Sequence, residues 1–108
     1  MIAATDLVNV ADGLTMTRGS LTKIANAHVE HFRVLAARAR AGALGYRLDE
    51  CEGYLATWQA AVKTLESDDP VALGEDARGE FIDALTSGDY DEYLADRDVD
   101  ALLAWWHE

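Results

Sequence analysis

Apolar residues recur at three- and four-residue steps after Ser20, and this spacing predicts an amphipathic helix of about twenty residues. Ser20 suits the N-cap, because its hydroxyl can accept a hydrogen bond from a backbone N–H of the first turn. Gly42 and Gly45 are expected to end this helix and to form the connection that follows. The apolar stripe consists of Leu21, Ile24, His28, Phe32, Leu35 and Ala39.

A second helix is predicted from Asp49 onward. Asp49 and Glu52 have the spacing of a capping box, in which an N-cap acceptor is followed three residues later by a glutamate. Acids in this first turn also suit the positive end of the helix. The periodic signal is stronger here than anywhere else in the chain, with Cys51, Leu55, Trp58, Val62 and Leu65 on one face.

A third helix is predicted after Pro70, since proline fits the first helical turn. Its stripe is closed by Ser87 and Gly88 and consists of Leu73, Ala77, Phe81 and Leu85.

The last part of the chain divides at Asp96-Arg97-Asp98 and predicts two short helices. The first contains Tyr90, Tyr93 and Leu94. Asp98 is expected to cap the second, which has its apolar positions at Val99, Leu102, Leu103 and Trp106.

Residues 1–19 fit two structures. Thr5 can cap a short helix that contains Leu7, Val10 and Leu14. The same region also alternates over 7–10 and 14–17 around the turn residues 11–13, which is typical of a hairpin. We favour a helical or irregular arm and keep the hairpin as the alternative.

These patterns predict an all-α fold, a small bundle of four to five amphipathic helices in a single acidic domain that spans residues 1–108. With 108 residues the chain is long enough to close one modest hydrophobic core. We expect that core to contain Ile24, Phe32, Leu35, Leu55, Trp58, Val62, Phe81, Leu85 and Leu102.

Charge divides the chain into two unequal parts. Residues 1–48 hold six basic and three acidic groups, a net charge of +3, whereas residues 49–108 hold three basic and seventeen acidic groups, a net charge of −14. Such asymmetry concerns partners and long-range attraction rather than the fold. It indicates that one region of the folded surface is strongly negative.

Composition and the ends of the chain indicate a cytoplasmic protein. Cys51 is the single cysteine and cannot form an intrachain disulfide, which fits a reducing compartment. The first residues lack the basic and apolar regions of a secretory signal. No apolar run reaches the roughly 18–20 residues that span a bilayer, so no membrane partner is expected.

The residues that can bind a transition metal are few. His28, His31, Cys51 and His107 are the candidates, and zinc needs three or four of them to converge. His28 and His31 lie three residues apart on one helix, which keeps a metal-binding helical enzyme or sensor open as an alternative. We expect instead that His28 is a hydrogen-bonded core residue and that the protein needs no cofactor.

Calcium is not expected at Asp96, Asp98 and Asp100. A calcium loop that began at Asp96 would need glycine at its sixth position and glutamate at its twelfth, where this chain has Ala101 and His107.

Catalysis and direct nucleic-acid binding are not expected either. No nucleophile has a local signature of a base and an orienting group, and no glycine-rich loop suited to phosphate is present. A net charge of −11 opposes attraction to phosphates. The arginines Arg33, Arg38 and Arg40 are expected to pair with acids of the C-terminal half inside the fold.

The acids themselves are the main candidate site. Asp76, Glu80 and Asp83 follow each other at helical spacing, with Glu75 beside them, and Glu92, Asp96 and Asp100 repeat a four-residue step. Carboxylates at such spacing resemble the regular charge of a nucleic-acid backbone. Our predicted partner-binding residues are Glu75, Asp76, Glu80, Asp83, Asp89, Asp91, Glu92, Asp96, Asp100 and Trp105.

Two adjacent tryptophans complete the candidate residues. Adjacent helical positions point about 100° apart, so one face cannot bury both side chains. Trp106 continues the stripe of Val99 and is predicted to lie in the core. Trp105 is then expected to be partly exposed and, with Tyr90 and Tyr93, to meet a partner or a second copy, which makes a homodimer possible. The alternative is that Trp105 packs on the N-terminal arm.

Taken as a hypothesis, these features describe a non-catalytic acidic protein that binds a positively charged, nucleic-acid-binding protein and occupies its nucleic-acid site. In size and charge the chain resembles the nucleic-acid mimics of phages and mobile elements, anti-CRISPR proteins among them, which implies action in the host cytoplasm. The rival hypotheses are a toxin-neutralising immunity or antitoxin protein, and the metal-binding protein that would use His28 and His31.

Overall fold

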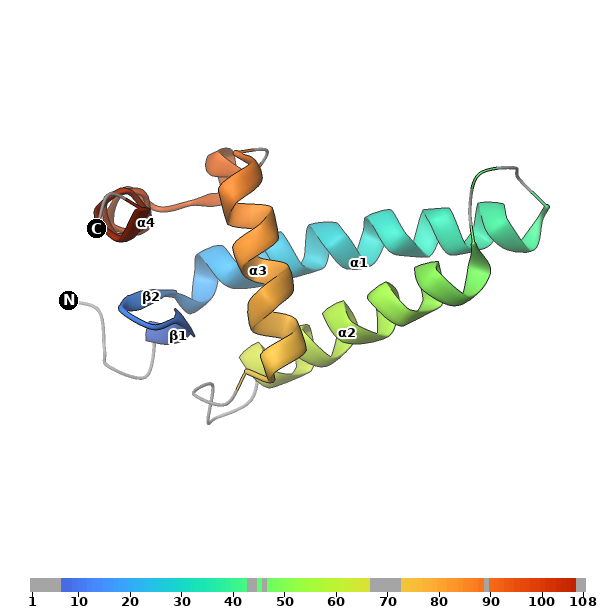
Figure 1. Ribbon diagram of the computed structural model, residues 1–108, viewed down its shortest axis with the longest axis horizontal. Helices are drawn as coiled ribbons and strands as arrows, with labels where there is room; N and C mark the ends of the chain where they lie inside the picture. Colours follow the sequence, from blue (N-terminus) through green and yellow to red (C-terminus); the bar gives the residue numbers. More distant parts are fainter. Residues whose placement is uncertain (1–6, 43–44, 46, 67–72, 89, 107–108) are drawn as a thin grey trace.

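The computed structural model describes residues 7–42, 45, 47–66, 73–88 and 90–106. This part of the chain forms a two-stranded sheet, four α-helices and one short 3₁₀ helix (Figure 1). The elements in chain order are β1 (Leu7–Ala11), β2 (Leu14–Thr17), α1 (Arg18–Arg40), α2 (Leu48–Glu66), α3 (Glu75–Ser87), η2 (Asp91–Tyr93) and α4 (Asp96–Trp106).

The fold is mostly helical but not all-α, because the N-terminal segment is a β hairpin. The helical or irregular arm that we favoured over residues 1–19 is therefore wrong for the described part, residues 7–19, and the alternative hairpin is correct. Gly13 adopts a φ of +79°, which only glycine reaches without strain, and it forms the turn with Asp12. Alternation places Val8, Val10, Leu14 and Met16 in the core, each at most 1% exposed.

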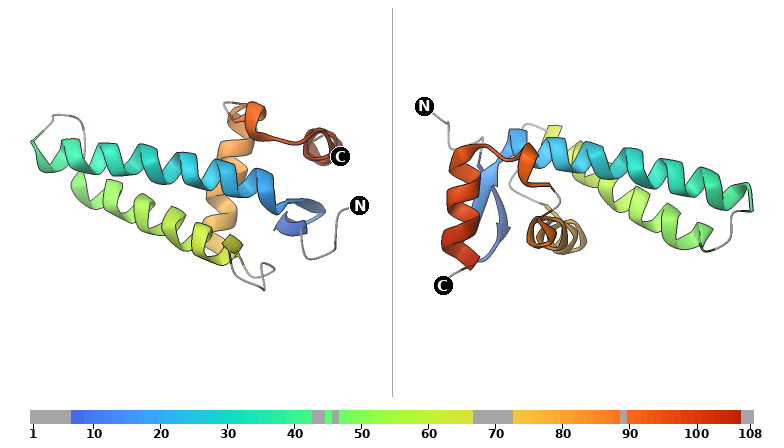
Figure 2. Two further views of the ribbon diagram at one scale, coloured as in Figure 1. Left: turned by 180° about the vertical axis from the view of Figure 1, so that it is seen from behind. Right: turned by 90° about the horizontal axis from the view of Figure 1, so that it is seen from above.

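Helices α1 and α2 run antiparallel beside each other and extend away from the rest of the molecule (Figures 1 and 2). We call residues 18–66, which contain these two helices, the helix pair. The molecule is consequently elongated, with principal extents of 48 × 30 × 21 Å. Helix α3 crosses the pair near the start of α1 and the end of α2, and α4 lies alongside the β hairpin (Figure 2).

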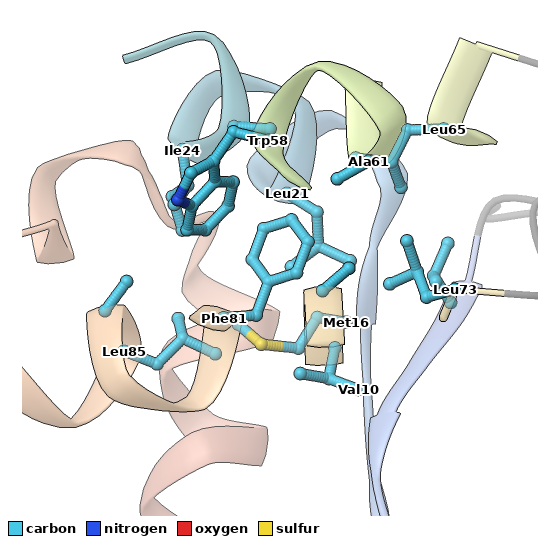
Figure 3. Close-up of a cluster of buried hydrophobic side chains, with 14 of the residues drawn as sticks. Val10, Met16, Leu21, Ile24, Trp58, Ala61, Leu65, Leu73, Phe81 and Leu85 are labelled. Atoms are coloured by element: carbon cyan, nitrogen blue, oxygen red, sulfur yellow. The ribbon is translucent and has the colours of Figure 1, made fainter. Parts of the chain in front are cut away.

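The hydrophobic core lies where the hairpin, the start of α1, the end of α2 and α3 meet (Figure 3). Phe81 of α3 packs edge-on against Trp58 of α2, with ring centroids 4.9 Å apart. Leu21 of α1 and Met16 of β2 complete this contact, and all four side chains have no exposed surface. Every described element except η2 and α4 contributes a fully or nearly fully buried apolar side chain to this one cluster.

The predicted core is confirmed near the base of the helix pair and is weaker along its length. Ile24, Trp58, Phe81 and Leu85 are buried. Phe32, Val62 and Leu102 are partly buried against the core, whereas Leu35 and Leu55 are only partly buried on the outer part of the pair. Two helices cover each other from one side only, so the stripe there stays half exposed.

Several helix ends differ from the predicted ones. Helix α1 begins at Arg18, so Ser20 lies inside its first turn and Thr17 is the N-cap. Helix α2 begins at Leu48, which places Asp49 in the first turn rather than at the cap. The predicted ends near Gly42 and at Gly88 are confirmed, the latter with a left-handed φ of +77°. Thr5 and Pro70 lie outside the described residues.

No described helix combines the length and the apolar character that crossing a membrane requires.

Candidate functional site

Three acids form a row on one flank of α3. Asp76 and Asp83 are exposed, and Glu80 between them is half-buried. The buried side of α3 is made by Ala77 and Phe81, so the row faces away from the core as its spacing predicts. We call Asp76, Glu80 and Asp83 the acidic row.

Partial burial and the like charges of the row both act on the pKa of Glu80. Partial burial, together with the neighbouring charges of Asp83 and Asp76, raises the pKa of Glu80 above its ordinary value. Desolvation and like charges both disfavour an ionised carboxyl group. The charge of Glu80 therefore costs the isolated fold some stability.

Asp76 and Glu80 of the acidic row border a groove between α2 and α3. Two adjoining hollows of about 510 and 430 Å³ share Thr57 and Asp76 in their walls. Helix α2 supplies small residues and Tyr54, whose side chain is 44% exposed. The carboxylates in the walls come from Glu50, Glu75, Asp76 and Glu80.

Basic residues do not neutralise the acidic row in the described part of the chain. Arg33 pairs with Glu30 on α1, and Arg40 pairs with Glu52 of α2 at 3.0 Å. Arg47 lies 3.5 Å from both Asp49 and Glu50. The expectation that Arg33, Arg38 and Arg40 pair with acids of the C-terminal half holds for Arg40 alone. Among the described residues, the ion pairs of α1 and α2 all lie within the helix pair.

The acids near the C-terminal end differ in exposure. Asp91, Glu92, Asp96 and Asp100 are exposed and, within the described residues, have no ion pair. Asp98, placed between two of them, is fully buried. The predicted site residue Asp89 lies outside the described residues.

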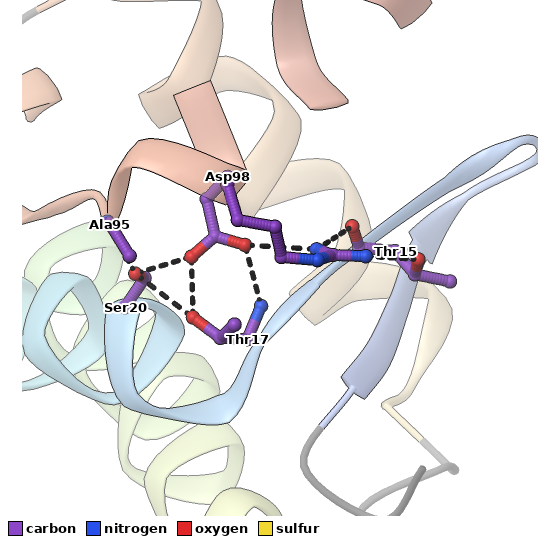
Figure 4. Close-up of polar contacts among 6 residues, drawn as sticks. Thr15, Thr17, Ser20, Ala95 and Asp98 are labelled. Carbon is purple, nitrogen blue, oxygen red and sulfur yellow. Dashed lines mark hydrogen bonds and ion pairs between the residues drawn. The ribbon is translucent and has the colours of Figure 1, made fainter. Parts of the chain in front are cut away.

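The prediction that Asp98 caps its own helix is wrong. Its carboxylate accepts hydrogen bonds from the backbone N–H of Thr17 at 2.8 Å, from the Thr17 hydroxyl, and from the Ser20 hydroxyl at 2.6 Å (Figure 4). Arg97 donates to the same carboxylate and to the carbonyl of Thr15, both at 3.1 Å. Asp98 thus serves the first turn of α1, where a negative charge suits the helix end.

The surroundings of Asp98 keep it ionised. Burial alone would raise its pKa, but the hydrogen bonds from Ser20, Thr17 and Arg97 outweigh burial and hold the pKa of Asp98 below its ordinary value. The Ser20 hydroxyl also accepts the backbone N–H of Ala95 at 3.1 Å, which fastens the start of α4 to α1. Asp98 is a structural residue and not part of an open acidic surface.

The two tryptophans of α4 exchange their predicted positions. Trp105 is half-buried on the hairpin, where its indole N–H donates to the carbonyl of Asp12 at 3.0 Å and its ring lies beside Gly13. Trp105 therefore packs on the N-terminal arm, which is the alternative given for it from the sequence. Trp106, predicted in the core, is 53% exposed. The inward face of α4 is set by Asp98 and not by Val99, which the apolar stripe could not indicate.

Tyr90 and Tyr93 lie against the core beside α1. Both are partly buried, with ring centroids 6.1 Å apart. Tyr90 also contacts the ring of His28 at a centroid distance of 4.5 Å. Most of this aromatic edge is therefore covered within the molecule.

His28 is a hydrogen-bonded core residue, as predicted. Its Nδ1 donates to the carbonyl of Ile24 at 2.9 Å, and its ring stacks on Trp58 with centroids 4.0 Å apart. Burial, opposed by the hydrogen bond to Ile24 and assisted by the charge of His31, lowers the pKa of His28 below its ordinary value. The imidazole is accordingly neutral near pH 7.

Metal ligands do not gather in the part of the chain that the structure describes, since no three His, Cys, Asp or Glu side chains there are placed to share an ion. His31 is exposed and Cys51 is buried in the first turn of α2. His107 lies outside the described residues.

Sequence reasoning missed two residues of the candidate surface. Tyr54 and Glu50 line the groove opposite the acidic row, and neither belongs to the apolar stripe of α2. Their positions four residues apart on the outer face of α2 were a usable signal, but the pairing of α2 with α3 was needed to interpret it.

Comparison with known proteins adds no relative. The chain matches no protein-family model, no curated protein and no solved structure. The candidate site therefore rests on its geometry and charge alone.

Proposed function

We propose that the protein is a non-catalytic acidic interaction protein that binds a basic protein surface through the acidic row and the groove between α2 and α3. The observation that carries the proposal is the acidic row itself. Its three carboxylates repel each other, raise the pKa of Glu80 and lack a basic partner among the described residues. A positively charged partner would relieve that repulsion on binding.

The most specific form of the proposal is an inhibitor that occupies a nucleic-acid-binding site. Asp76 and Asp83 lie seven positions apart, about 10.5 Å along the helix axis, so successive charges of the row are spaced by about 5 Å on average, against about 3.4 Å along one nucleic-acid strand. The groove adds Tyr54, an aromatic face on which an arginine can stack. An inhibitor of phage or mobile-element origin, similar in action to anti-CRISPR proteins, fits these features.

Reversal of the row tests the proposal. Partners captured from the source cell by the wild-type protein are identified by mass spectrometry, and the affinity of the purified partner is then measured. D76K/E80K/D83K should weaken binding by at least tenfold, while E30K/D49K/E52K, which changes the net charge equally on the helix pair, should bind nearly as well as the wild type. Urea unfolding of all three proteins verifies that the variants are folded.

Salt and competition identify the kind of partner. The association rate should fall steeply as salt rises, because the reach of the field shortens from about 30 Å at 0.01 M to about 8 Å at physiological ionic strength. The partner's own DNA or RNA should compete if the protein is a nucleic-acid mimic. If the captured partner is a toxic enzyme and nucleic acid does not compete for its binding, the immunity or antitoxin hypothesis is favoured. Equal binding by the row-reversed variant would remove the proposal altogether.

A further inference from the structure

Helix α4 carries apolar side chains on its outer face as well as its inner one. Asp98, Leu102 and Trp105 face the hairpin and α1. Leu103 and Trp106 face away and are 52% and 53% exposed. Val99 is partly exposed, and the three lie at positions i, i+4 and i+7, which form one stripe along a helix. We call Val99, Leu103 and Trp106 the outer stripe.

A row of negative charge borders the outer stripe. Asp96 and Asp100 are exposed and lie one turn apart, at helical angles next to Leu103. Arg97, the basic residue of α4, is turned away from this face, because its guanidinium contacts Asp98 and the carbonyl of Thr15. The outer face of α4 thus combines an apolar stripe with carboxylates that have no ion pair in the described part of the chain.

This combination disfavours a second copy as the occupant. Two copies that met through α4 would bring Asp96 and Asp100 of each chain close together, at a net charge of −11 per chain. A partner with apolar and basic side chains in parallel rows matches the face in both respects.

We propose that the outer face of α4 is a second docking surface, which binds an amphipathic basic helix with Trp106 as its anchor. The inference rests on the proposed function, in that the segment belongs to the same kind of basic partner, and it adds a separate contact on a different helix. Leu103 and Trp106 would bury apolar side chains of the segment, while Asp96 and Asp100 would face its lysines or arginines.

A synthetic probe tests this surface without knowledge of the partner. The probe is a labelled 18-residue peptide with leucine on one helical face and lysine on the other, and a leucine–glutamate peptide of the same pattern is the control. The wild-type protein should bind the lysine peptide and not the glutamate peptide in fluorescence anisotropy. Binding should also shield tryptophan fluorescence from acrylamide, since Trp106 is the exposed indole of α4.

Matched variants locate the binding site. L103A/W106A should lower affinity for the lysine peptide by at least tenfold, and D96N/D100N should lower it several-fold with a smaller salt dependence. V34A removes a side chain of α1 that is 41% exposed and should have no effect. Urea unfolding of each variant separates loss of binding from loss of fold.

The outcomes separate the two proposals. If L103A/W106A binds the peptide as the wild type does while D76K/E80K/D83K does not, the α2–α3 groove is the site and the inference on α4 is wrong. If the α4 variant alone loses binding, the inference stands, and the acidic row is judged separately by the affinity of D76K/E80K/D83K for the captured partner. A wild-type dimer in sedimentation that L103A/W106A converts to a monomer would make a second copy the occupant and overturn the proposal.

Discussion

The helix pair and the C-terminal region, residues 67–108, differ in net charge and in how many of their charged side chains form ion pairs. The helix pair has seven basic and five acidic groups, a net charge of +2, and its ion pairs lie within and between α1 and α2. The C-terminal region has two basic and thirteen acidic groups, a net charge of −11, and Asp98 is its one described acid in an ion pair.

The difference shows where the charge boundary lies in space. The sequence divides most simply between residues 48 and 49, but the acids that open α2 pair with Arg40 at the end of α1 and with Arg47 just before α2. Arg40 and Glu52 are the clearest example, at 3.0 Å. Folding therefore moves the boundary to the end of α2 and concentrates the unpaired negative charge on α3, η2 and α4.

The largest expected effect comes from the side chain that joins the two regions. Trp58→Ala should lower the free energy of unfolding by about 3–5 kcal/mol, because Trp58 is fully buried between His28 and Phe81. Leu55→Ala on the half-exposed part of α2 should cost less than about 2 kcal/mol, the lower end for fully buried leucines. Urea unfolding measures both. Equal costs would mean that the helix pair is as well packed along its length as at its base.

Removal of the Asp98 carboxylate should be the next most costly change. Asp98→Ala should destabilise the protein by about 2–4 kcal/mol, since it deprives Thr17 and Ser20 of a buried charged acceptor. The pKa of Asp98 is lower in the folded state than its ordinary value of 3.8, so its contribution is complete above that pH and is lost as pH falls through the folded pKa. The stability difference between wild type and Asp98→Asn should shrink below pH 4, and a constant difference down to pH 2 would contradict this assignment.

Protonation of His28 should weaken its packing against Trp58 and Tyr90, with a gradual effect on stability. Its folded pKa is below 6.5, so the unfolded state binds more protons and stability falls as pH drops from 6.5 toward the folded pKa. The slope from this one group is at most about 1.4 kcal/mol per pH unit. His28→Gln should flatten stability against pH in that window, measured by urea unfolding, with His31→Gln as the exposed control. If only His31→Gln flattens the dependence of stability on pH, the effect belongs to His31 and the prediction for His28 is wrong.

The smallest expected effect is a gain in stability. The pKa of Glu80 is raised above 4.5 in the folded state, so its charge opposes folding above that pKa and ceases to do so once it is protonated. Glu80→Gln should stabilise the isolated protein at pH 7 by a few tenths of a kcal/mol, and the gain should vanish in acid and shrink in high salt, which screens the repulsion from Asp83 and Asp76. Glu66→Gln on α2 provides a comparison outside the row, and a loss of stability in Glu80→Gln would show that the carboxylate has a stabilising partner.

Periodicity predicted the helices well because each one buries a continuous stripe, as Trp58 and Phe81 illustrate. It failed for the N-terminal hairpin, where Val8 and Val10 fit both helical and alternating spacing, and only packing against α3 decides between them. It also placed Trp106 in the core because it assigned the inner face from apolar residues alone. A buried carboxylate such as Asp98 has no apolar signature, so the orientation of α4 could not be predicted.

The candidate surface was predictable in part. The acidic row was found from spacing, because exposed acids on a helix keep the periodicity of the helix itself. Its neighbours Glu50 and Tyr54 belong to a different helix, and local sequence patterns do not predict which helices pack against each other. The proposed docking face on α4 depends in the same way on where Asp98 is buried.

The bond between Asp98 and Thr17 joins positions 81 residues apart in the chain. During synthesis the first turn of α1 leaves the ribosome without its acceptor, and it gains one only after nearly all of the described residues have been made. The helix pair can form early from contacts between neighbouring segments, whereas the junction of β2 with α1 must wait for α4. A nascent chain held just short of residue 98 should therefore be protected from cleavage over α2 and the rest of α1, and be readily cleaved near Thr17 and Arg18, where α1 begins.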